Sequence, residues 1–486
     1  MPNPLVVYPP FLASVAHPDR MAVRAHLRGF SAPDPNRCRV LELGCGAGWS
    51  SLAFGYSLPG SEFIGIDLSE PAIAQGQDWA ARLGLSNVHL RQGDVREIGE
   101  ADGQFDYIFA HGLLSWVPEP VRQKVFEICR DRLAPTGVAY LSYNAYPAGH
   151  MRQMVREMLR FHTRAKHSDA DRIAQGHGLM RALVETPVPG TTYHQHLVRV
   201  AERMEEMPPE QILFDELAEE NQHYYFHEFV TRAASYGMDY LADAEFAELS
   251  LGLPAKTQAV LARIPDRLTR EQYLDFFIGR AFRQTMLCRT GQQQPRPSHA
   301  ETLRGLWLGG PMELVPPPTE ESGDNAQAIQ KWSGAIGGTI GTAHAPTQAA
   351  FARLGSAWPA CIEGQEILAA APTADDTEIM AGMLVQCVHS GVLRAHVHPP
   401  PAAHSAGEKP RASAMVRAMI GQRFVPNLAS EAIAISSEAD EQLLRLLDGA
   451  GTRAELAAGL GIGADKLDAD LRRFVRLELL EEHPRG

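Results

Sequence analysis

One stretch of this chain constrains its fold more than any other, because an apolar segment runs directly into three closely spaced glycines in Val40-Leu-Glu42-Leu-Gly44-Cys-Gly46-Ala-Gly48. This pattern predicts a buried strand that turns sharply into a helix. Glycines allow the backbone to approach a ligand closely, and the N-terminus of the following helix presents free N–H groups. The stretch therefore predicts a nucleotide-like ligand at the end of the strand.

The spacing of the glycines separates two classes of ligand. A dinucleotide-binding turn has the pattern G-x-G-x-x-G, which would place its third glycine at position 49. That position holds Trp49, and the third glycine is Gly48. Because a bulky tryptophan at this position would keep a pyrophosphate away from the helix, the spacing disfavours a dinucleotide.

Residues 39–143 alternate short apolar runs with amphipathic stretches, a pattern typical of a parallel sheet covered by helices. The predicted strands are Arg39–Leu43, Glu62–Asp67, Asn87–Arg91, Phe105–Ala110 and Val138–Tyr143. The predicted helices are Ser50–Ser57, Glu70–Leu83 and Val121–Leu133. The sequence thus predicts the α/β class, with the glycine turn at the carboxyl end of the first strand.

The acidic residue in the first strand and the glycines after it form the pattern E-x-G-x-G-x-G, which resembles motif I of the class I methyltransferases that use S-adenosylmethionine (SAM). The resemblance implies a Rossmann-like fold and gives roles to two further acidic residues. Asp67, at the end of the second strand, would accept hydrogen bonds from both ribose hydroxyls, which suits a carboxylate because it is acceptor-only. Asp94, after the third strand, would lie near the adenine amino group.

The segment after the fourth strand, Ala110-His-Gly-Leu-Leu-Ser-Trp116-Val-Pro118, is implied to face the methyl group of the cofactor. The residues expected to hold SAM, and after transfer the product S-adenosylhomocysteine, are Glu42, Gly44, Gly46, Gly48, Asp67, Leu68, Asp94, Val95 and His111.

Most of the chain resembles a family of bacterial methyltransferases that carry a methyltransferase regulatory domain. The segments that carry the resemblance are Tyr8-Pro-Pro, His17-Pro-Asp19, His111-Gly, Ser115-Trp-Val-Pro118, Ser142-Tyr-Asn144, Tyr224-Tyr-Phe-His-Glu-Phe229 and Phe282-Arg-Gln-Thr285. The family includes protein-lysine methyltransferases that act on outer-membrane proteins, so the resemblance implies a lysine amine of a protein or peptide as the acceptor. The chain departs from the family pattern at Pro147-Ala-Gly149-His150, where Pro-Gly-Trp is expected.

Methyl transfer from a sulfonium is an in-line displacement, so much of its catalysis can come from positioning the acceptor. A lysine amine, with an ordinary pKa of about 10.4, must react in its neutral form, and aromatic faces stabilise the cationic product. The residues expected to serve catalysis are His111, as base or proton relay, together with Tyr143 and Asn144. The expected walls of the acceptor site are Tyr8, Trp116, Tyr143, Tyr224 and Tyr225, with Tyr8 on an N-terminal segment that could close over the cofactor.

These side chains also have ordinary structural interpretations. Aromatic residues at strand ends and on helix faces pack in cores, and His111 could hydrogen-bond the neighbouring backbone. The only compact histidine pair, His194-x-His196, lacks nearby cysteine or acidic partners, so no metal site is expected.

Changes in composition along the chain divide it into four regions. Residues 1–149 form the expected SAM-binding catalytic domain and residues 150–300 a helical middle domain, in which Met238–Leu241 could return as a strand to the sheet. Residues 301–345 are expected to be a linker, with Pro/Gly-containing polar stretches at Gly291–Ser298 and Pro316–Asn325.

Residues 346–486 are expected to form winged-helix-like modules. The last of these has predicted helices at Glu438–Leu447 and Ala464–Arg476 and a strand at Leu477–Glu482. Because the helix from Ala464 opens with Asp465, Asp468 and Asp470, it is unsuited to DNA. The modules are therefore expected to contact a partner protein or to form a homodimer.

The formal net charge of -13, from 58 acidic and 45 Lys+Arg residues, disfavours nucleic acid and anionic membranes as partners. The six cysteines include no C-x-x-C pair, and the N-terminus lacks the features of a signal peptide, so a cytoplasmic protein is expected.

Two alternatives to protein-lysine methylation stay open. The chain could methylate a small molecule or natural-product intermediate at O, N or C, because this fold changes acceptors by altering its lids. It could also bind SAM without turnover and act as a regulatory or scaffold protein.

Overall fold

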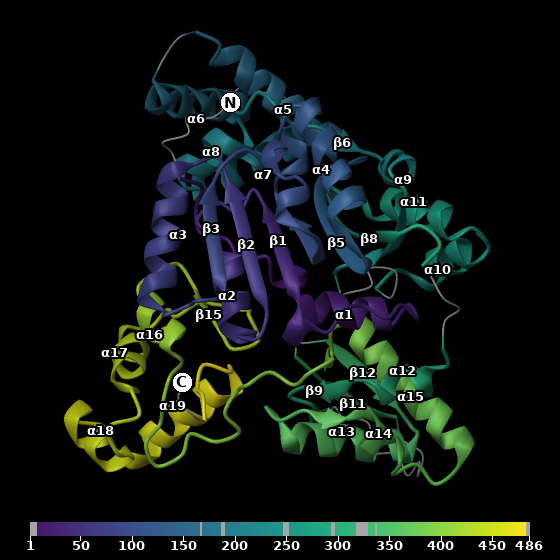
Figure 1. The fold of residues 1–486 in the computed structure, drawn as a ribbon, viewed down its shortest axis with the longest axis vertical. Helices are drawn as coiled ribbons and strands as arrows, with labels where there is room; N and C mark the ends of the chain where they lie inside the picture. Colours follow the sequence, from purple (N-terminus) through teal and green to yellow (C-terminus); the bar gives the residue numbers. More distant parts are fainter. Residues whose placement is uncertain are drawn as a thin grey trace.

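An eight-stranded sheet is built from strands that lie between Arg39 and Arg289 (Figure 1). The computed structural model describes residues 7–165, 168–185, 190–245, 252–292, 297–316, 329–335 and 338–482. The strands are β1 (Arg39–Leu43), β2 (Glu62–Asp67), β3 (Val88–Gln92), β4 (Phe105–Ala110), β5 (Leu133–Ala145), β6 (His223–Tyr224), β7 (Met238–Asp243) and β8 (Phe282–Arg289). Their order is β3-β2-β1-β4-β5-β8-β7, with β6 pairing beside β5.

The α/β prediction is confirmed, since β1 to β5 are mutually parallel. β1, β2 and β4 have the predicted bounds. β8 pairs antiparallel with β5, and β7 pairs antiparallel with β8, so the strand predicted to return to the sheet does so.

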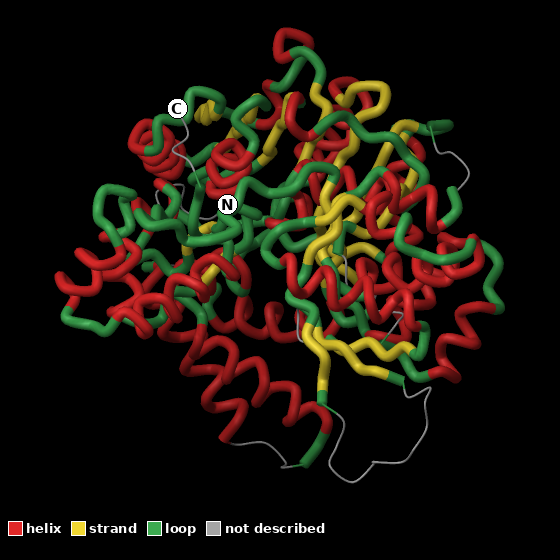
Figure 2. Tube along the Cα trace, turned by 90° about the horizontal axis from the view of Figure 1, so that it is seen from below, coloured by secondary structure: helices red, strands yellow, loops and turns green. Residues whose placement is uncertain are grey.

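Helices cover both faces of the sheet (Figure 2). Because side chains alternate along a strand, Val40 packs on one face and Leu41 on the other. The first face lies against α1 (Pro18–His26), α2 (Trp49–Ser57) and α3 (Glu70–Arg82), and the second against α4 (Glu119–Arg132) and α9 (Phe226–Ser235).

The region expected to be a helical middle domain is divided between two structures. Helices α5 (Gly149–His162), α6 (Asp169–Glu185), α7 (Thr192–Glu206) and α8 (Pro209–Asp215) share a core of their own. They leave the sheet after β5 and lie beyond its carboxyl edge, at the top of Figure 1. The chain then returns to the sheet as β6 to β8, together with α9, α10 (Ala255–Ala262) and α11 (Arg267–Ile278).

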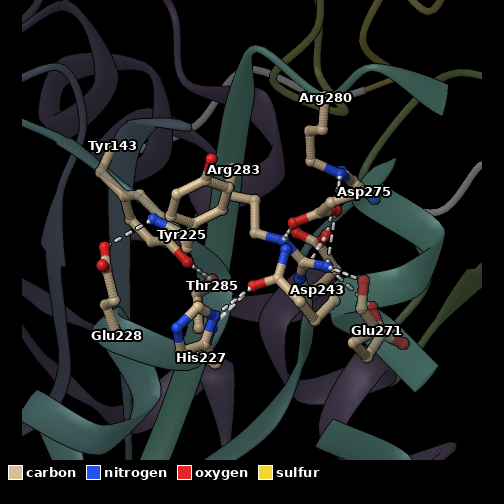
Figure 3. A network of polar contacts seen from close by, with 11 residues as sticks. Tyr143, Tyr225, His227, Glu228, Asp243, Glu271, Asp275, Arg280, Arg283 and Thr285 are labelled. Carbon is tan, nitrogen blue, oxygen red and sulfur yellow. Dashed lines mark hydrogen bonds and ion pairs between the residues drawn. The ribbon is translucent and has the colours of Figure 1, made fainter. Parts of the chain in front are cut away.

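A buried ion network fixes β8 to its neighbours (Figure 3). The guanidinium group of Arg283 in β8 is fully buried and donates two hydrogen bonds to Asp275 of α11, at 2.8 and 2.9 Å. It also reaches Glu271 at 3.0 Å and Asp243 of β7 at 3.4 Å. Arg280 contacts Asp275 at 2.7 Å and Asp243 at 3.2 Å. These contacts tie the last two strands to α11.

Residues 301–345, expected to be a linker, belong to a folded module. This module comprises α12 (His299–Arg304), β9 (Trp307–Gly309), β10 (Glu313–Val315), β11 (Gln330–Ser333), β12 (Thr339–Thr342), α13 (Ala345–Ala357), β13 (Ile362–Glu363), α14 (Gly364–Leu368), α15 (Ala374–His389) and β14 (Arg394–His396). β9 is the central strand between β13 and β14. A strand of three residues is too short to show an alternating pattern in the sequence. Residues 293–296 and 317–328, which include parts of both expected linkers, lie outside the described residues.

The last module contains α16 (Ala414–Met419), β15 (Val425–Pro426), β16 (Ala432–Ile433), α17 (Glu438–Leu446), α18 (Arg453–Leu460) and α19 (Ala464–Arg476). The predicted strand at Leu477–Glu482 is reduced to one bridge between Leu480 and Ala412. The reason is that Glu478 adopts a left-handed backbone with φ of 56°, which interrupts an extended segment. The winged-helix shape of the modules stays a prediction.

Both C-terminal modules are anchored to helices that cover the eight-stranded sheet. Buried Asp19 of α1 accepts hydrogen bonds from His396 Nδ1 at 2.9 Å and from the N–H of Val397 at 2.8 Å. Tyr56 of α2 accepts from the N–H of Ala414 at 3.0 Å and donates to Glu481 at 3.1 Å.

Among the helices in the described residues, none combines the length and apolar character needed to cross a membrane.

Replacing Arg283 by methionine should lower the free energy of unfolding by about 3–5 kcal/mol, because it leaves buried carboxylates without their partner. The matched control is Arg473→Met, which breaks a half-exposed pair with Asp440 and should cost at most about 1 kcal/mol. Urea unfolding followed by tryptophan fluorescence measures both. Equal effects of the two substitutions would contradict a structural role for the network.

Candidate functional site

The glycine turn after β1 has the conformation that its sequence predicts. Gly44, Gly46 and Gly48 have φ values of 70°, 53° and 69°, a left-handed region that other residues rarely adopt. A Cβ at Gly44 would lie 2.8 Å from the side chain of Leu113, whereas a Cβ at Gly46 would meet nothing within 4 Å. The turn therefore packs against the segment after β4 at one glycine and leaves open space at the next.

Asp67 lies at the carboxyl end of β2 and is directed at this turn. Its carboxylate accepts hydrogen bonds from the N–H of Gly46 and the N–H of Ser69, both at 2.8 Å. Each carboxylate oxygen has a second lone pair to offer, so the group can hold the turn and still accept hydrogen bonds from a ligand. Leu68, next in the chain, is half-exposed beside it.

Glu42 is directed at the start of α2. Its buried carboxyl group accepts hydrogen bonds from Ser51 in the first turn of α2, from the N–H at 3.2 Å and from the hydroxyl. Burial raises the pKa of Glu42 to about 8. The structure thus gives Glu42 a positioning role, in which it fixes the start of α2 relative to β1.

Asp94 and Val95 follow β3 in a tight turn. The Asp94 side chain accepts from the N–H of Arg96 at 2.9 Å and from the Arg96 guanidinium, which lowers the pKa of Asp94. Val95 is buried in the core beneath this turn. The sequence placed both residues on the adenine side of the ligand, and the structure places them at the carboxyl edge two strands from the glycine turn's own strand.

Trp49 is buried between α3 and the last module. Its ring lies 6.2 Å from Trp79 and 5.5 Å from Phe424, measured between ring centroids. The position at which a dinucleotide-binding turn needs a glycine is therefore used to attach a C-terminal module to the first turn of α2.

His111, directly after β4, is held on three sides. Its ring stacks on Phe11 at 4.5 Å and meets Phe282 edge-on at 5.7 Å. Its Nδ1 is 2.7 Å from the hydroxyl of Tyr140, and that hydroxyl donates to Gln284 at 2.8 Å. Because the Tyr140 proton is used toward Gln284, the His111 Nδ1 must carry the proton of this pair, which leaves Nε2 as an acceptor.

Burial lowers the pKa of His111 to about 4, so the imidazole is neutral at physiological pH. Its segment adjoins the glycine turn through Leu113. The site therefore carries a neutral imidazole on the segment that packs against the glycine turn.

Asn144, at the end of β5, joins three segments at the carboxyl edge. Its N–H donates to the hydroxyl of Ser115 at 2.8 Å, and its side-chain amide donates to Asn221 at 2.7 Å. Gln222 in turn donates its N–H to the carbonyl of Ser115 at 2.8 Å. Asn144 therefore holds the segment after β4 against the segment that precedes β6.

Trp116 lies beneath α5. The guanidinium groups of Arg152 and Arg156 lie over its ring at 5.6 and 5.2 Å. Trp116 is part-exposed, so its ring is both a support for two arginines and an accessible surface at this edge.

The N-terminal segment runs from α8 across His111 to α2. Tyr8 packs edge-on against Phe214 of α8 at 5.5 Å, and its hydroxyl lies 3.5 Å from Asp215. Three residues later, Phe11 covers His111, and the N–H of Ala13 then donates to Ser50 of α2 at 3.1 Å. We call residues 8–11 the strap.

Three of the expected walls lie elsewhere. Tyr143 is buried on the opposite face of the sheet from Tyr140 and stacks on Phe229 at 4.0 Å. It therefore lies away from His111, which Tyr140 contacts. Tyr224 is buried against Tyr143. Tyr225 is part-exposed and its hydroxyl lies 3.1 Å from His150, whose ring stacks on Tyr146.

The sequence interpretation missed several residues of this site. Phe11 and Gln284 lie within or beside quoted segments, and their proximity to Tyr8 and Phe282 was the available signal. Asp215 gave no signal, because it lies in an insertion whose path over the sheet edge is set by tertiary structure. The pair His194 and His196 is hydrogen-bonded to backbone carbonyls, and no cluster of three metal-ligating side chains is found in the part of the chain that the structure describes.

Two regions of the chain match known protein families. Residues 40–137 match a family described as a methyltransferase domain, and residues 208–289 match a predicted methyltransferase regulatory domain. The uncharacterised protein RP028 of Rickettsia prowazekii is 31% identical over 47% of this chain and 92% of its own length. The uncharacterised protein RP789 of the same organism is 34% identical over 58% of this chain, but the chain spans only 52% of that protein.

A solved structure of PKMT2 from Rickettsia typhi matches 97% of this chain and 99% of its own, with 25% identity and a TM-score of 0.82. A second structure of PKMT2, in complex with AdoHcy, matches with 24% identity and the same TM-score. The whole arrangement of sheet, helical insertion and C-terminal modules is therefore shared with a solved protein.

The raised pKa of Glu42 gives a pH-dependent stability. An unfolded glutamate ionises near its ordinary value of 4.5, whereas the folded one holds its proton to about pH 8, so the wild type should lose stability as the pH rises between these values. Glu42→Gln removes this loss. The free energy of unfolding of the variant should therefore rise relative to that of the wild type by up to about 5 kcal/mol across this pH range. Urea unfolding of both proteins from pH 5 to about pH 8.5 measures it, and parallel profiles would contradict the assignment.

Proposed function

The chain belongs to the SAM-dependent methyltransferases that carry a methyltransferase regulatory domain, and on that premise we propose that it transfers a methyl group from SAM to a lysine amine of a protein or peptide. The observation that carries the proposal is the neutral imidazole of His111, which Phe11 of the strap covers and whose segment packs against the glycine turn through Leu113. The likeness to PKMT2 over nearly the full length supports the acceptor class.

The residues at the carboxyl edge fit the cofactor. Asp67 has acceptor lone pairs for ribose hydroxyls, the open side of Gly46 allows a ligand to approach the backbone, and Leu68 exposes an apolar surface beside them. When bound, SAM supplies an electrophilic methyl carbon on a sulfonium. Glu42 and Trp49 would not contact the cofactor. They hold the start of α2 in place, and α2 follows the glycine turn directly.

His111 is suited to orient an amine rather than to deprotonate an ammonium group. A base with a pKa of about 4 takes few protons from a lysine ammonium, so the acceptor must lose its proton to water before transfer. The His111 Nε2 can then accept an N–H of the neutral amine and direct the nitrogen lone pair at the methyl group. Tyr140 and Gln284 contribute by fixing the tautomer that makes this possible.

The proposal is tested by labelled methyl transfer. The full-length protein is incubated with methyl-labelled SAM and peptides that contain one lysine, with arginine-substituted peptides as controls. Label on the lysine Nζ, located by mass spectrometry, is the expected result. Label confined to small molecules of a bacterial extract would favour the small-molecule alternative, and SAM binding with no transfer to either pool would favour a scaffold protein.

Asp67→Asn should weaken SAM binding, because it removes charge-assisted hydrogen bonds worth about 1.5–3 kcal/mol each. A rise in Kd of at least about tenfold in calorimetry is the expected result. Asp78→Asn is the matched control, since Asp78 is exposed on α3 and pairs with Arg82 of the same helix. Unchanged affinity in Asp67→Asn would remove this residue from the cofactor site.

His111→Phe keeps an aromatic ring against Phe11 but removes the accepting nitrogen. We expect kcat to fall by roughly 100-fold through loss of orientation, while the Kd for SAM stays within about twofold. Rapid-quench assays and calorimetry give the two values. A large loss of SAM affinity with normal kcat would instead make His111 a cofactor ligand.

The cytoplasmic location and the homodimer stay predictions.

A further inference from the structure

A carboxylate with incomplete hydrogen bonding lies beside Tyr8 of the strap. Asp215 ends α8, and its side chain is 15% exposed. One oxygen accepts from Gln211 at 3.1 Å, the Tyr8 hydroxyl lies 3.5 Å away, and the guanidinium of Arg152 lies 3.8 Å away. Two of these three contacts are long, since charge-assisted hydrogen bonds to a carboxylate are usually about 2.7–2.9 Å.

The neighbouring arginines are satisfied by another residue. Arg152 lies 2.9 Å from Glu216 and Arg203 lies 3.3 Å from the same oxygen, so Glu216 is their main partner. Burial raises the pKa of Asp215, which means that the ionised form is short of stabilising partners. A further cation at Asp215 would therefore make a closer contact than Arg152 does, while Arg152 and Arg203 keep their contacts with Glu216.

Tyr8 lies beside this carboxylate, and Phe214 packs on Tyr8. Phe214 precedes Asp215 in α8, and Tyr8 packs on Phe214 edge-on, with ring centroids 5.5 Å apart and planes at 77°. Tyr8 is 39% exposed, so its ring surface is open to solvent. A carboxylate beside aromatic faces is the combination that binds an alkylammonium group, through a charge-assisted hydrogen bond and cation–π attraction.

We propose that Asp215, Tyr8 and Phe214 form a binding site for the ammonium group of the acceptor side chain, so that the enzyme selects cationic amines before the methyl transfer. The inference rests on the proposed function and names the residues that recognise its substrate class. Asp215 binds the charged form of the amine. The proton then passes to water, and the neutral nitrogen bonds to the methyl carbon as the carbon–sulfur bond breaks and its electron pair stays on sulfur.

The strap connects this site to His111. Tyr8 and Phe11 are three residues apart, so their backbones are separated by at most about 11 Å. The strap therefore links the two groups, because Tyr8 lies at Asp215 and Phe11 covers His111, and we place the acceptor side chain along it. A neutral acceptor such as a phenol has no charge for Asp215 to bind, which favours amines over hydroxyl acceptors at this site.

The test measures binding and turnover separately in the full-length protein. n-Butylammonium imitates the lysine side chain, and its binding in the presence of S-adenosylhomocysteine is followed by ligand-observed NMR. Asp215→Asn keeps the hydrogen bond from Gln211 but loses the charge, so it should weaken n-butylammonium binding by about tenfold or more and raise the KM of a single-lysine peptide similarly. kcat and the Kd for SAM should change by less than about threefold.

Three further variants serve as controls. Asp215→Glu should recover most of the binding, and Tyr8→Phe should cost only a few-fold. Glu210→Gln, at an exposed position in the first turn of α8, should leave every value unchanged. Circular dichroism confirms that each variant is folded.

The outcomes separate the two proposals. If the wild type methylates lysine and Asp215→Asn has a normal KM and normal n-butylammonium binding, the amine site is overturned and the proposed function stands. If the wild type methylates no lysine yet binds n-butylammonium through Asp215, the amine site stands and the protein-lysine activity fails.

Discussion

The antiparallel pairing of β8 with β5 joins two separated parts of the chain into one sheet. The arrangement of side chains around His111 is a consequence of that pairing. Because β8 returns beside β5, Gln284 reaches the hydroxyl of Tyr140 and thereby fixes the tautomer of His111. The same pairing forces residues 149–222 to leave and re-enter at the carboxyl edge, where α8 brings Asp215 to the strap. The fully buried Arg283 in β8 makes the pairing depend on α11 and β7 as well.

The chemistry that follows relies on position more than on acid–base strength. In the proposed reaction, His111 lies on the segment that packs against the glycine turn, so it would orient the acceptor nitrogen toward the cofactor that Asp67 would bind. A neutral imidazole of low basicity is compatible with this role, because the displacement needs an aligned lone pair and not a strong base. Charge recognition is placed at a different residue, Asp215, which can hold an ammonium group without taking part in the bond-forming step.

The features that could be predicted from the sequence are those with a local physical cause. The left-handed glycines at alternate positions and the carboxylate at the end of β2 are set by backbone sterics and short-range hydrogen bonds, so the sharp turn and the place of Asp67 at the strand end could be predicted. The error at Tyr143 was avoidable in part. Side chains alternate along a strand, so Tyr143 and Asn144 cannot point to the same face, and the choice between them depends on which face the strap covers.

Other features depend on contacts between distant segments. The pairing of β9 with β13 and β14 carries no period that three residues could reveal, which is why residues 301–345 were expected to be a linker. Trp49 was recognised as incompatible with a dinucleotide, but its partner Phe424 is distant in the sequence and could not be inferred. Asp215 becomes part of the site only because the insertion folds over the sheet edge.

A crystal structure of the protein with S-adenosylhomocysteine and a single-lysine peptide tests the central claim most directly. The account predicts the ribose hydroxyls on Asp67, the sulfur facing His111, and the lysine side chain under the strap between His111 and Asp215. A nucleoside bound away from the glycine turn, or a peptide seated on another face of the sheet, would contradict it.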